Sequence, residues 1–267
     1  MSSGIRDPQV RQEQSRSRGR WDDYWKKKHD VERVYSNEGR IAENLEKVTA
    51  LSGRSVLEVG AGTGRDSADL AKRGAFVVVL DNSSSAIDVM VKVRETKGVR
   101  FFPVVGDVRW LPFSSESFEI VFHQGLLEHF KDPGEVLGEN CRVLAKGGYL
   151  LVDVPQKYHP YTFVKHILMA LGKWFAGWET EYTIRGLGNT LRHAGFREIV
   201  HRYGTWMYPS FFYRSLREIL LGAGIRLPMY PSLTPVTKKA RAILRKEAAK
   251  IPLSFLTYHT IGIVAKK

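Results

Sequence analysis

Short apolar runs alternate with segments of helical period along residues 55–155 of this chain of 267 residues. Buried strands are predicted where four or five consecutive residues are mostly apolar, at 56–59, 76–80, 101–105, 118–122 and 149–152. Between these runs, apolar residues recur at helical spacing, and Ser84 and Gly98 are placed to begin and end one of the helices. Strands separated by helices predict a parallel sheet with helices on both faces and right-handed connections.

The pattern continues on both sides of this region. Helical spacing predicts a helix over 41–51 that ends at Gly53, and a helix capped by Thr183 that ends at Gly195. A sixth strand is predicted at 196–201 and the last strand at 257–264. Further amphipathic helices are predicted at 163–175, 210–221 and 237–250.

Composition narrows the class of protein. An apolar content of 43% is enough for a sizeable core, which excludes disorder throughout. The single cysteine, Cys141, forms neither an internal disulfide nor a thiolate zinc site by itself, so the chain is predicted to be cytoplasmic. Residues 1–20 lack the apolar region of a signal peptide, and no later window resembles a membrane span.

The net charge of +13 lies wholly in the second part of the chain. Residues 1–155 hold 23 Lys and Arg against 23 Asp and Glu, whereas residues 156–267 hold 18 against 5. This asymmetry favours a neutral binding or catalytic module joined to a segment that meets phospholipid, nucleic acid or an acidic metabolite. The alternative is a basic, well-solvated surface.

A glycine-rich turn joins the first predicted strand to a helix in the segment 56–66, VLEVGAGTGRD. Glycines let the backbone approach a ligand without Cβ clashes, and N–H groups at the start of the helix face that ligand. The spacing of Gly60, Gly62 and Gly64 departs from the dinucleotide pattern Gly-x-Gly-x-x-Gly, because Arg65 stands at the third glycine position. A nicotinamide cofactor is therefore disfavoured.

This turn, with Glu58 two places before its first glycine, resembles motif I of the class I S-adenosylmethionine-dependent methyltransferases. Three more segments follow in the order and spacing of that family: Asp81 after the second strand, the triplet GDV at 106–108, and FEIVFHQGLLEHF at 118–130. The last segment resembles the subgroup that includes ubiquinone and menaquinone methylases. The resemblance covers residues 55–155 well and the flanks in outline.

The resemblance implies a Rossmann-like, doubly wound α/β sheet, mostly parallel with an antiparallel last strand. Helical insertions would follow the fifth strand and separate the sixth from the seventh. The implied cofactor is S-adenosylmethionine, with S-adenosylhomocysteine as product. Asp81 would bind ribose, and Asp107 with Val108 would bind adenine. Glu58 would anchor the turn or bind the amino group. For Glu58 and Asp107 the alternative is a structural role in capping loop N–H groups. The other implied cofactor residues are Gly60, Gly62, Thr63, Gly64, Asn82, Gln124 and Gly125, with Tyr24 and Tyr35 in an N-terminal lid.

A single domain over 21–267 is predicted after a flexible tail at 1–20. Its expected parts are N-terminal lid helices at 21–53, the cofactor-binding core at 55–155, and insertions that cover the substrate at 156–181 and 204–250.

Methyl transfer from a sulfonium is an in-line displacement, for which proximity and orientation supply most of the acceleration. A base is needed only when the acceptor loses a proton. The candidates are His123, His129 and His159, which follow the fourth and fifth strands at the edge where such sheets bind ligands. A structural role in the turn is the alternative for His129, and a solvated loop for His159. No histidine has metal-ligand spacing, so no metal is predicted.

Both insertions combine large apolar residues with Lys and Arg. In the first of them an apolar stripe at helical spacing consists of Phe163, Ile167, Leu171, Trp174 and Phe175. Helices of this composition cover an apolar substrate, lie on an anionic membrane surface or add a second layer of core.

We therefore expect a small-molecule acceptor that is hydrophobic, anionic or both, such as a lipid, quinone precursor, polyketide or lipid-linked saccharide. Peripheral contact with an anionic membrane is a further expectation. The alternative is an RNA methyltransferase that uses the basic helix at 237–250, which is disfavoured because the sequence has no Asn/Asp-Pro-Pro-aromatic motif and no appended RNA-binding module. A third hypothesis is a protein that binds the cofactor without turnover.

Overall fold

A seven-stranded sheet forms the centre of the protein in the computed structural model, which describes residues 19–26, 39–172, 174, 179–206, 211–228, 239, 243, 247, 250 and 258–267. The strand order is β3-β2-β1-β4-β5-β7-β6. The strands are β1 Ser55–Val59, β2 Phe76–Asp81, β3 Phe101–Val105, β4 Phe118–Gln124, β5 Leu144–Pro155, β6 Glu198–Thr205 and β7 Thr260–Lys266. Strands β1 to β5 run parallel, and β7 pairs antiparallel with both β5 and β6. The predicted doubly wound sheet with an antiparallel last strand is confirmed.

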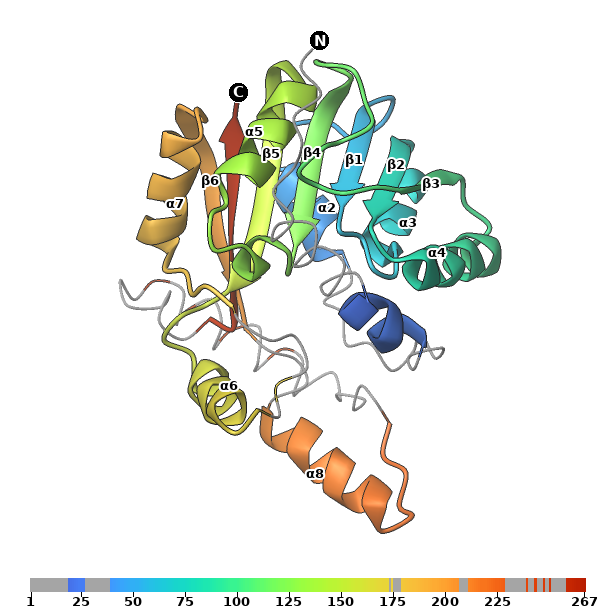
Figure 1. Ribbon diagram of the computed structural model, residues 1–267, viewed down its shortest axis with the longest axis vertical. Helices are drawn as coiled ribbons and strands as arrows, with labels where there is room; N and C mark the ends of the chain where they lie inside the picture. Colours follow the sequence, from blue (N-terminus) through green and yellow to red (C-terminus); the bar gives the residue numbers. More distant parts are fainter. Residues whose placement is uncertain are drawn as a thin grey trace.

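Helices cover both faces of this sheet (Figure 1). Their bounds are α2 Arg40–Leu45, α3 Arg65–Lys72, α4 Ser84–Lys97, α5 Gly134–Val143, α6 Pro160–Ala170, α7 Ile184–His193 and α8 Phe211–Gly222, with a 3₁₀ turn η2 at Leu127–His129. Residues 19–26 are also helical. One face packs against α2, α3 and α4, and the other against α5 and α7. None of the helices within the described ranges is long and apolar enough to cross a membrane.

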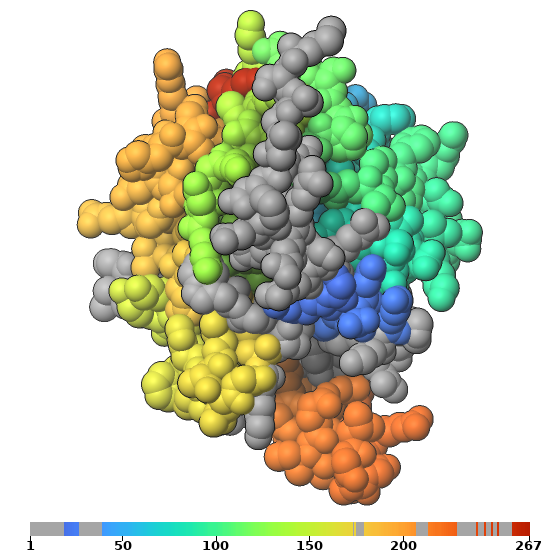
Figure 2. Space-filling view, viewed as in Figure 1, coloured from blue at the N-terminus to red at the C-terminus, as the bar shows by residue number. Residues whose placement is uncertain are grey.

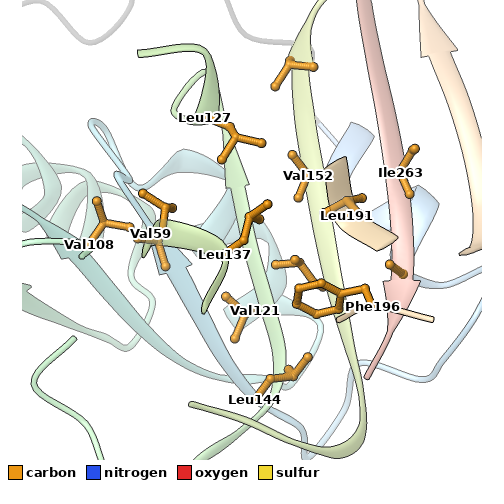
Figure 3. Close-up of a cluster of buried hydrophobic side chains, with 14 of the residues drawn as sticks. Val59, Val108, Val121, Leu127, Leu137, Leu144, Val152, Leu191, Phe196 and Ile263 are labelled. Atoms are coloured by element: carbon orange, nitrogen blue, oxygen red, sulfur yellow. The ribbon is translucent and has the colours of Figure 1, made fainter. Parts of the chain in front are cut away.

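Alternate side chains of the central strands enter opposite layers of the core, as the period of two in a strand requires. Leu57 and Val121 lie in the layer under α5 and α7, whereas Val56 and Ile120 lie in the layer under α3 and α4. Figure 3 shows the first layer, where side chains of β4 meet those of α5, α7 and β7. Full burial of one such side chain contributes about 1.5–3 kcal/mol to folding.

Two boundaries of helix α4 show how local chemistry sets its ends. Its cap is Ser83, whose Oγ accepts a hydrogen bond from the backbone N–H of Ala86 at 3.2 Å, so the predicted cap at Ser84 is wrong by one residue. Gly98 ends the helix as predicted, with φ of 61° in the left-handed region.

Other elements end earlier than their apolar pattern predicts. Helix α5 ends at Val143 and the chain joins β5 directly at Leu144, five residues before the predicted strand at 149–152. Helix α6 stops at Ala170, shortly before Gly172 with φ of 65°, so Trp174 lies beyond its end. The predicted helix at 237–250 falls mostly outside the described residues, as do Tyr35 and Phe175.

Strands β1, β4, β5 and β6 all end at the same edge of the sheet, and α6, α8 and the helical segment 19–26 lie beyond that edge (Figure 1). We call it the carboxyl edge. The strand order reverses between β1 and β4, which is where open α/β sheets bind ligands. The division into lid, core and insertions stays a prediction.

Candidate functional site

The turn after β1 approaches its neighbours too closely to carry side chains. Gly60, Gly62 and Gly64 have φ of 65°, 55° and 65°, all in the left-handed region. A Cβ on Gly60 would lie 2.8 Å from Leu126 Cδ1, and a Cβ on Gly62 would lie 2.5 Å from a ring carbon of Trp25. The close approach of Leu126 and Trp25 therefore requires glycine in this turn, which lies at the carboxyl edge between β1 and β4.

Asp81, the last residue of β2, holds this turn in place. Its Oδ2 accepts the N–H of Gly62 at 2.9 Å, and its Oδ1 accepts the N–H of Ser83 at 3.0 Å. Each carboxylate oxygen can accept a second hydrogen bond, so the pair has the capacity to bind a diol. Burial raises the pKa of Asp81, and the backbone hydrogen bonds from Ser83 and Gly62 oppose that rise.

Glu58 lies behind the turn rather than at its surface. Its carboxylate accepts a hydrogen bond from Ser67 Oγ in the first part of α3, which ties β1 to that helix. Burial, followed by the nearby Asp66, raises the pKa of Glu58 well above its ordinary value. This contact fits the predicted role in anchoring the turn.

A buried polar network runs from the start of α3 across the sheet. Gln124 Nε2 donates to Asp66, and Arg40 Nη2 donates to Gln124 Oε1 at 2.7 Å. Arg40 Nε lies 3.0 Å from Asp153 Oδ2, which also accepts the hydroxyl of Tyr203 at 2.9 Å. Burial raises the pKa of Asp153 to about 6, although Arg40 opposes the shift. Of these residues only Gln124 was predicted to belong to the site.

Asp107 is engaged by a residue two positions further on. Its Oδ1 accepts both the backbone N–H and the Nε of Arg109 at 3.0 Å, and its Oδ2 accepts Nη2 at 2.8 Å. The Arg109 guanidinium also lies 4.9 Å from the centre of the Trp110 ring. Val108 is buried. The hydrogen bond from the Arg109 N–H is the capping role that was the predicted alternative for Asp107. The carboxylate still has lone pairs that can accept from a further donor.

The helical segment 19–26 covers the carboxyl edge (Figures 1 and 2). The Trp25 ring packs on Gly62, and Asp22 Oδ1 accepts the hydroxyl of Ser83. The Tyr24 ring meets the Trp25 ring edge-on, with centroids 5.0 Å apart. This segment thus contacts the turns after both β1 and β2.

The three candidate histidines occupy different environments. His123 is fully buried, its pKa is lowered to about 3 by burial, and neither ring nitrogen has a partner within the described part of the chain. His129 meets the Trp21 ring edge-on at 5.1 Å, and burial lowers its pKa. His159 caps α6, where its Nδ1 accepts the N–H of Tyr161 at 3.1 Å. His129 and His159 lie at the carboxyl edge, whereas His123 lies inside the protein.

Ionisable side chains lie close together beside His129. Glu128 is 3% exposed, and burial raises the pKa of its carboxyl to about 8. Lys165 of α6, also buried, lies 2.8 Å from Glu179 and 2.9 Å from Glu181. The Lys165–Glu179 pair acts electrostatically on Glu128 and His129 alike. No set of three or more His, Cys, Asp or Glu residues in the described ranges is arranged to hold a metal ion.

His259, just before β7, is a site residue that sequence reasoning missed. Its ring lies edge-on to His159 at 5.2 Å and tilted against Tyr161 at the same distance. Burial, followed by His159, lowers the pKa of His259 to about 3, so both rings are neutral at pH 7. No local motif signals this contact, because antiparallel pairing of β7 with β5 is what brings the segments together.

Known proteins resemble the chain in the region of this site. Residues 57–152 match a family described as a methyltransferase domain. The ubiquinone biosynthesis O-methyltransferase of Coxiella burnetii is 36% identical over 104 residues, which are 39% of this chain and 44% of that protein. The demethylmenaquinone methyltransferase of Clavibacter sepedonicus is 30% identical over 174 residues, which are 58% of this chain and 70% of that protein. The match thus spans less than half of the first relative.

Solved structures share the fold at low sequence identity. A methyltransferase from Mesorhizobium loti aligns with a TM-score of 0.58 and 15% identity, covering 86% of this chain and 99% of that one. Another from Aquifex aeolicus aligns with a TM-score of 0.56 and 14% identity, covering 92% and 97%. The chain belongs to the class I S-adenosylmethionine-dependent methyltransferases, as the four motifs predicted.

Proposed function

We propose that this protein transfers the methyl group of S-adenosylmethionine to a small-molecule acceptor that is hydrophobic, anionic or both. The observation that carries the proposal is the left-handed glycine turn after β1, in which the N–H of Gly62 donates a hydrogen bond to the buried carboxylate of Asp81. Two relatives are named as a ubiquinone biosynthesis O-methyltransferase and a demethylmenaquinone methyltransferase, and these names favour a quinone precursor among such acceptors.

The chain's own residues fit the parts of this cofactor. The glycine turn lies at the strand end where the methionine part is expected, and the Asp81 carboxylate has lone pairs for both ribose hydroxyls. When bound, S-adenosylmethionine supplies an electrophilic methyl group on a sulfonium. The remaining residues that we assign to its binding are Glu58, Thr63, Asn82, Asp107, Val108, Gln124, Gly125 and Tyr24, with Tyr35 as a lid residue from the sequence.

Electrostatics at the carboxyl edge favours a cation. Buried carboxyl groups of Glu58, Asp66, Asp81 and Asp153 lie in or near the turn, and burial raises the pKa of each. A sulfonium and an ammonium placed among them would offset that cost, because an opposite charge favours the ionised form of a carboxyl. Aromatic faces of the segment 19–26 add cation–π attraction.

Catalysis then requires alignment and, for a hydroxyl acceptor, one proton transfer. With the cofactor bound, the acceptor atom would take the methyl group, and the electron pair of the broken carbon–sulfur bond would stay on sulfur. The proton of the acceptor passes to a base, for which we assign His129, with His159 as second candidate. Both lie at the carboxyl edge, where burial lowers their pKa values and so favours the neutral imidazole that a general base requires.

Cofactor binding is tested with Asp81→Asn, which keeps the shape of the side chain and removes its charge. Calorimetry should show binding of S-adenosylmethionine to the unmodified protein and an affinity about tenfold or more lower for the variant, because hydrogen bonds to a charged group are worth about 1.5–3 kcal/mol. Asp88→Asn, at an exposed position of α4, is the matched control and should bind normally. Absence of binding to the unmodified protein at millimolar cofactor would overturn the proposal.

The acceptor class is tested with labelled cofactor and cell extracts. Label should enter material that organic solvent extracts, and His129→Asn should lower the rate without a matching loss of cofactor affinity. Label that appears only in RNA would assign the protein to the alternative class and overturn the proposed acceptor.

A further inference from the structure

Large exposed apolar side chains concentrate at one end of the molecule. Twelve are exposed within the described residues, and eight of them lie in the part 156–267. On α6 and α8 and directly after them they are Phe163, Ile167, Leu171, Leu216, Ile219 and Ile225. Phe163 and Ile219 are each 70% exposed. Contiguous apolar surface on a soluble fold marks an interaction site.

Helix α6 presents this surface because its inner side is anchored. Lys165 is buried between Glu179 and Glu181, and the hydroxyl of Thr162 donates to the carbonyl of Gln156 at 2.7 Å. These contacts fix the rotation of the helix about its axis. Its apolar stripe, Phe163, Ile167 and Leu171, therefore points outward and does not add a second layer to the core.

Helix α8 lies at the same end of the long axis, beyond the carboxyl edge (Figures 1 and 2). None of its side chains from 213 to 222 is buried. It is held from one side, where Tyr213 donates to the carbonyl of Pro228 at 2.6 Å and Arg217 Nε donates to that of Leu227 at 3.3 Å. Its apolar side, with Leu216 and Ile219, remains exposed.

The charge of this part of the chain indicates what covers the apolar face. Residues 156–267 contain 18 Lys and Arg but only five acidic residues, Glu179, Glu181, Glu198, Glu218 and Glu247. Four of the five already form ion pairs with basic side chains of the same part. Glu198 begins β6, at the opposite edge of the sheet. Arg197, Lys266 and Lys267 lie at that opposite edge too and do not add charge to the end that carries α6 and α8. At that end, exposed apolar side chains lie beside the exposed cations Lys157 and Arg226.

We propose that the outer faces of α6 and α8 dock on an anionic phospholipid bilayer. Apolar side chains enter the acyl boundary while Lys and Arg meet the lipid phosphates, which is the division of labour in interfacial helices. Nucleic acid offers the charge without an apolar layer for Phe163 and Ile219. The docked carboxyl edge faces the bilayer, so a hydrophobic acceptor reaches the site directly from the membrane. That last step rests on the proposed function, whereas docking itself does not.

Docking is tested by flotation of the full chain with phosphatidylcholine vesicles, with and without about one-third phosphatidylglycerol. The protein should float with the anionic vesicles, much less with the neutral ones, and less as salt rises. The double variant Phe163→Ser, Ile219→Ser should lower the partition coefficient about tenfold or more, because burial of one such side chain is worth about 1.5–3 kcal/mol. Both positions are exposed, so its thermal unfolding should be nearly unchanged.

Phe76→Ser is the matched control, since Phe76 is 56% exposed at the start of β2, on the opposite edge of the sheet. It should float like the unmodified protein. Equal flotation of the double variant, or no flotation of the unmodified protein, would overturn docking. Docking would also be overturned if the protein were a dimer that the double variant converts to a monomer. The same holds if the protein bound RNA but not vesicles. Calorimetry with S-adenosylmethionine on the same variants separates failure of docking from failure of the proposed function.

Discussion

Glu128 offers a direct test of the electrostatics beside the site, through the variant Glu128→Gln. The side chain is buried, and burial raises the pKa of its carboxyl from 4.5 to about 8. The folded state therefore keeps a proton that the unfolded chain releases above about pH 4.5. Stability attributable to this group is complete below that pH and is lost as the pH rises towards 8.

The size of the effect follows from linkage. With pKa values of 4.5 unfolded and about 8 folded, the unfavourable contribution of Glu128 grows from about 1 kcal/mol at about pH 5 to about 4 kcal/mol at about pH 8. Glutamine keeps the shape of the neutral carboxyl and cannot ionise. The difference in unfolding free energy between variant and unmodified protein should therefore increase by about 3 kcal/mol in favour of the variant across this range.

Urea unfolding at several pH values measures this difference. Glu95→Gln, at an exposed position of α4, controls for the loss of one carboxylate and should change the difference by less than about 1 kcal/mol. Parallel stability curves for Glu128→Gln and the unmodified protein would refute the reasoning, because they would mean that Glu128 ionises in the fold as easily as in the unfolded chain.

Three further substitutions probe the packing of the site. Gly62→Ala puts a Cβ 2.5 Å from the Trp25 ring at a residue with φ of 55°. Urea unfolding should show an unfolding free energy lower by about 1–3 kcal/mol, and calorimetry should show a weaker cofactor affinity. Unchanged values would contradict the close approach. Lys165→Met leaves the buried carboxylate of Glu179 and the partly buried one of Glu181 without the lysine cation, so stability at neutral pH should fall by about 3–5 kcal/mol. An equal loss at about pH 4 would argue against this cause. Tyr203→Phe removes a hydrogen bond to Asp153 and should cost about 1–3 kcal/mol, which urea unfolding would detect and an unaltered midpoint would disprove.

The features that the sequence predicted well depend on residues close together along the chain. The strands were predicted from short apolar runs. The turn was predicted from Gly60, Gly62 and Gly64, because glycine adopts left-handed backbone conformations that other residues avoid. Helix ends at Gly98 and the cap at Thr183 are likewise local, with Thr183 Oγ1 accepting the N–H of Gly186 at 3.0 Å. Such signals require no knowledge of which elements meet in three dimensions.

The buried network around Asp153 could not be predicted in the same way. Arg40 and Gln124 are 84 positions apart, and Tyr203 is 50 positions from Asp153. Their contacts exist because β4, β5 and β6 take particular places in the strand order, which no local pattern specifies. His259 joins His159 for the same reason.

Periodicity also fails to tell which side of a helix is covered. The stripe of Phe163, Ile167 and Leu171 has the spacing of a core-facing helix, yet these residues are exposed. The contacts of Lys165 decide the matter, because its two carboxylate partners, Glu179 and Glu181, come from the segment after α6 and hold the polar side of the helix inward. An amphipathic pattern defines an apolar and a polar face of a helix, but long-range contacts decide which of the two faces is buried.

The chain separates two electrostatic tasks. Carboxyl groups gather at the turn that we assign to a cationic cofactor, in the half whose net charge is zero. Beyond the carboxyl edge, exposed Lys157 and Arg226 carry positive charge, and the acidic side chains Glu179 and Glu218 already form ion pairs. If the same surface served both tasks, the lysines and arginines that attract lipid phosphate would repel the sulfonium within the roughly 10 Å over which exposed charges interact in dilute salt. Exposed basic residues in the segments beside α6 and α8 keep both attractions. The overall charge of +13 is compatible with an acidic cofactor site because none of the excess lies in residues 1–155.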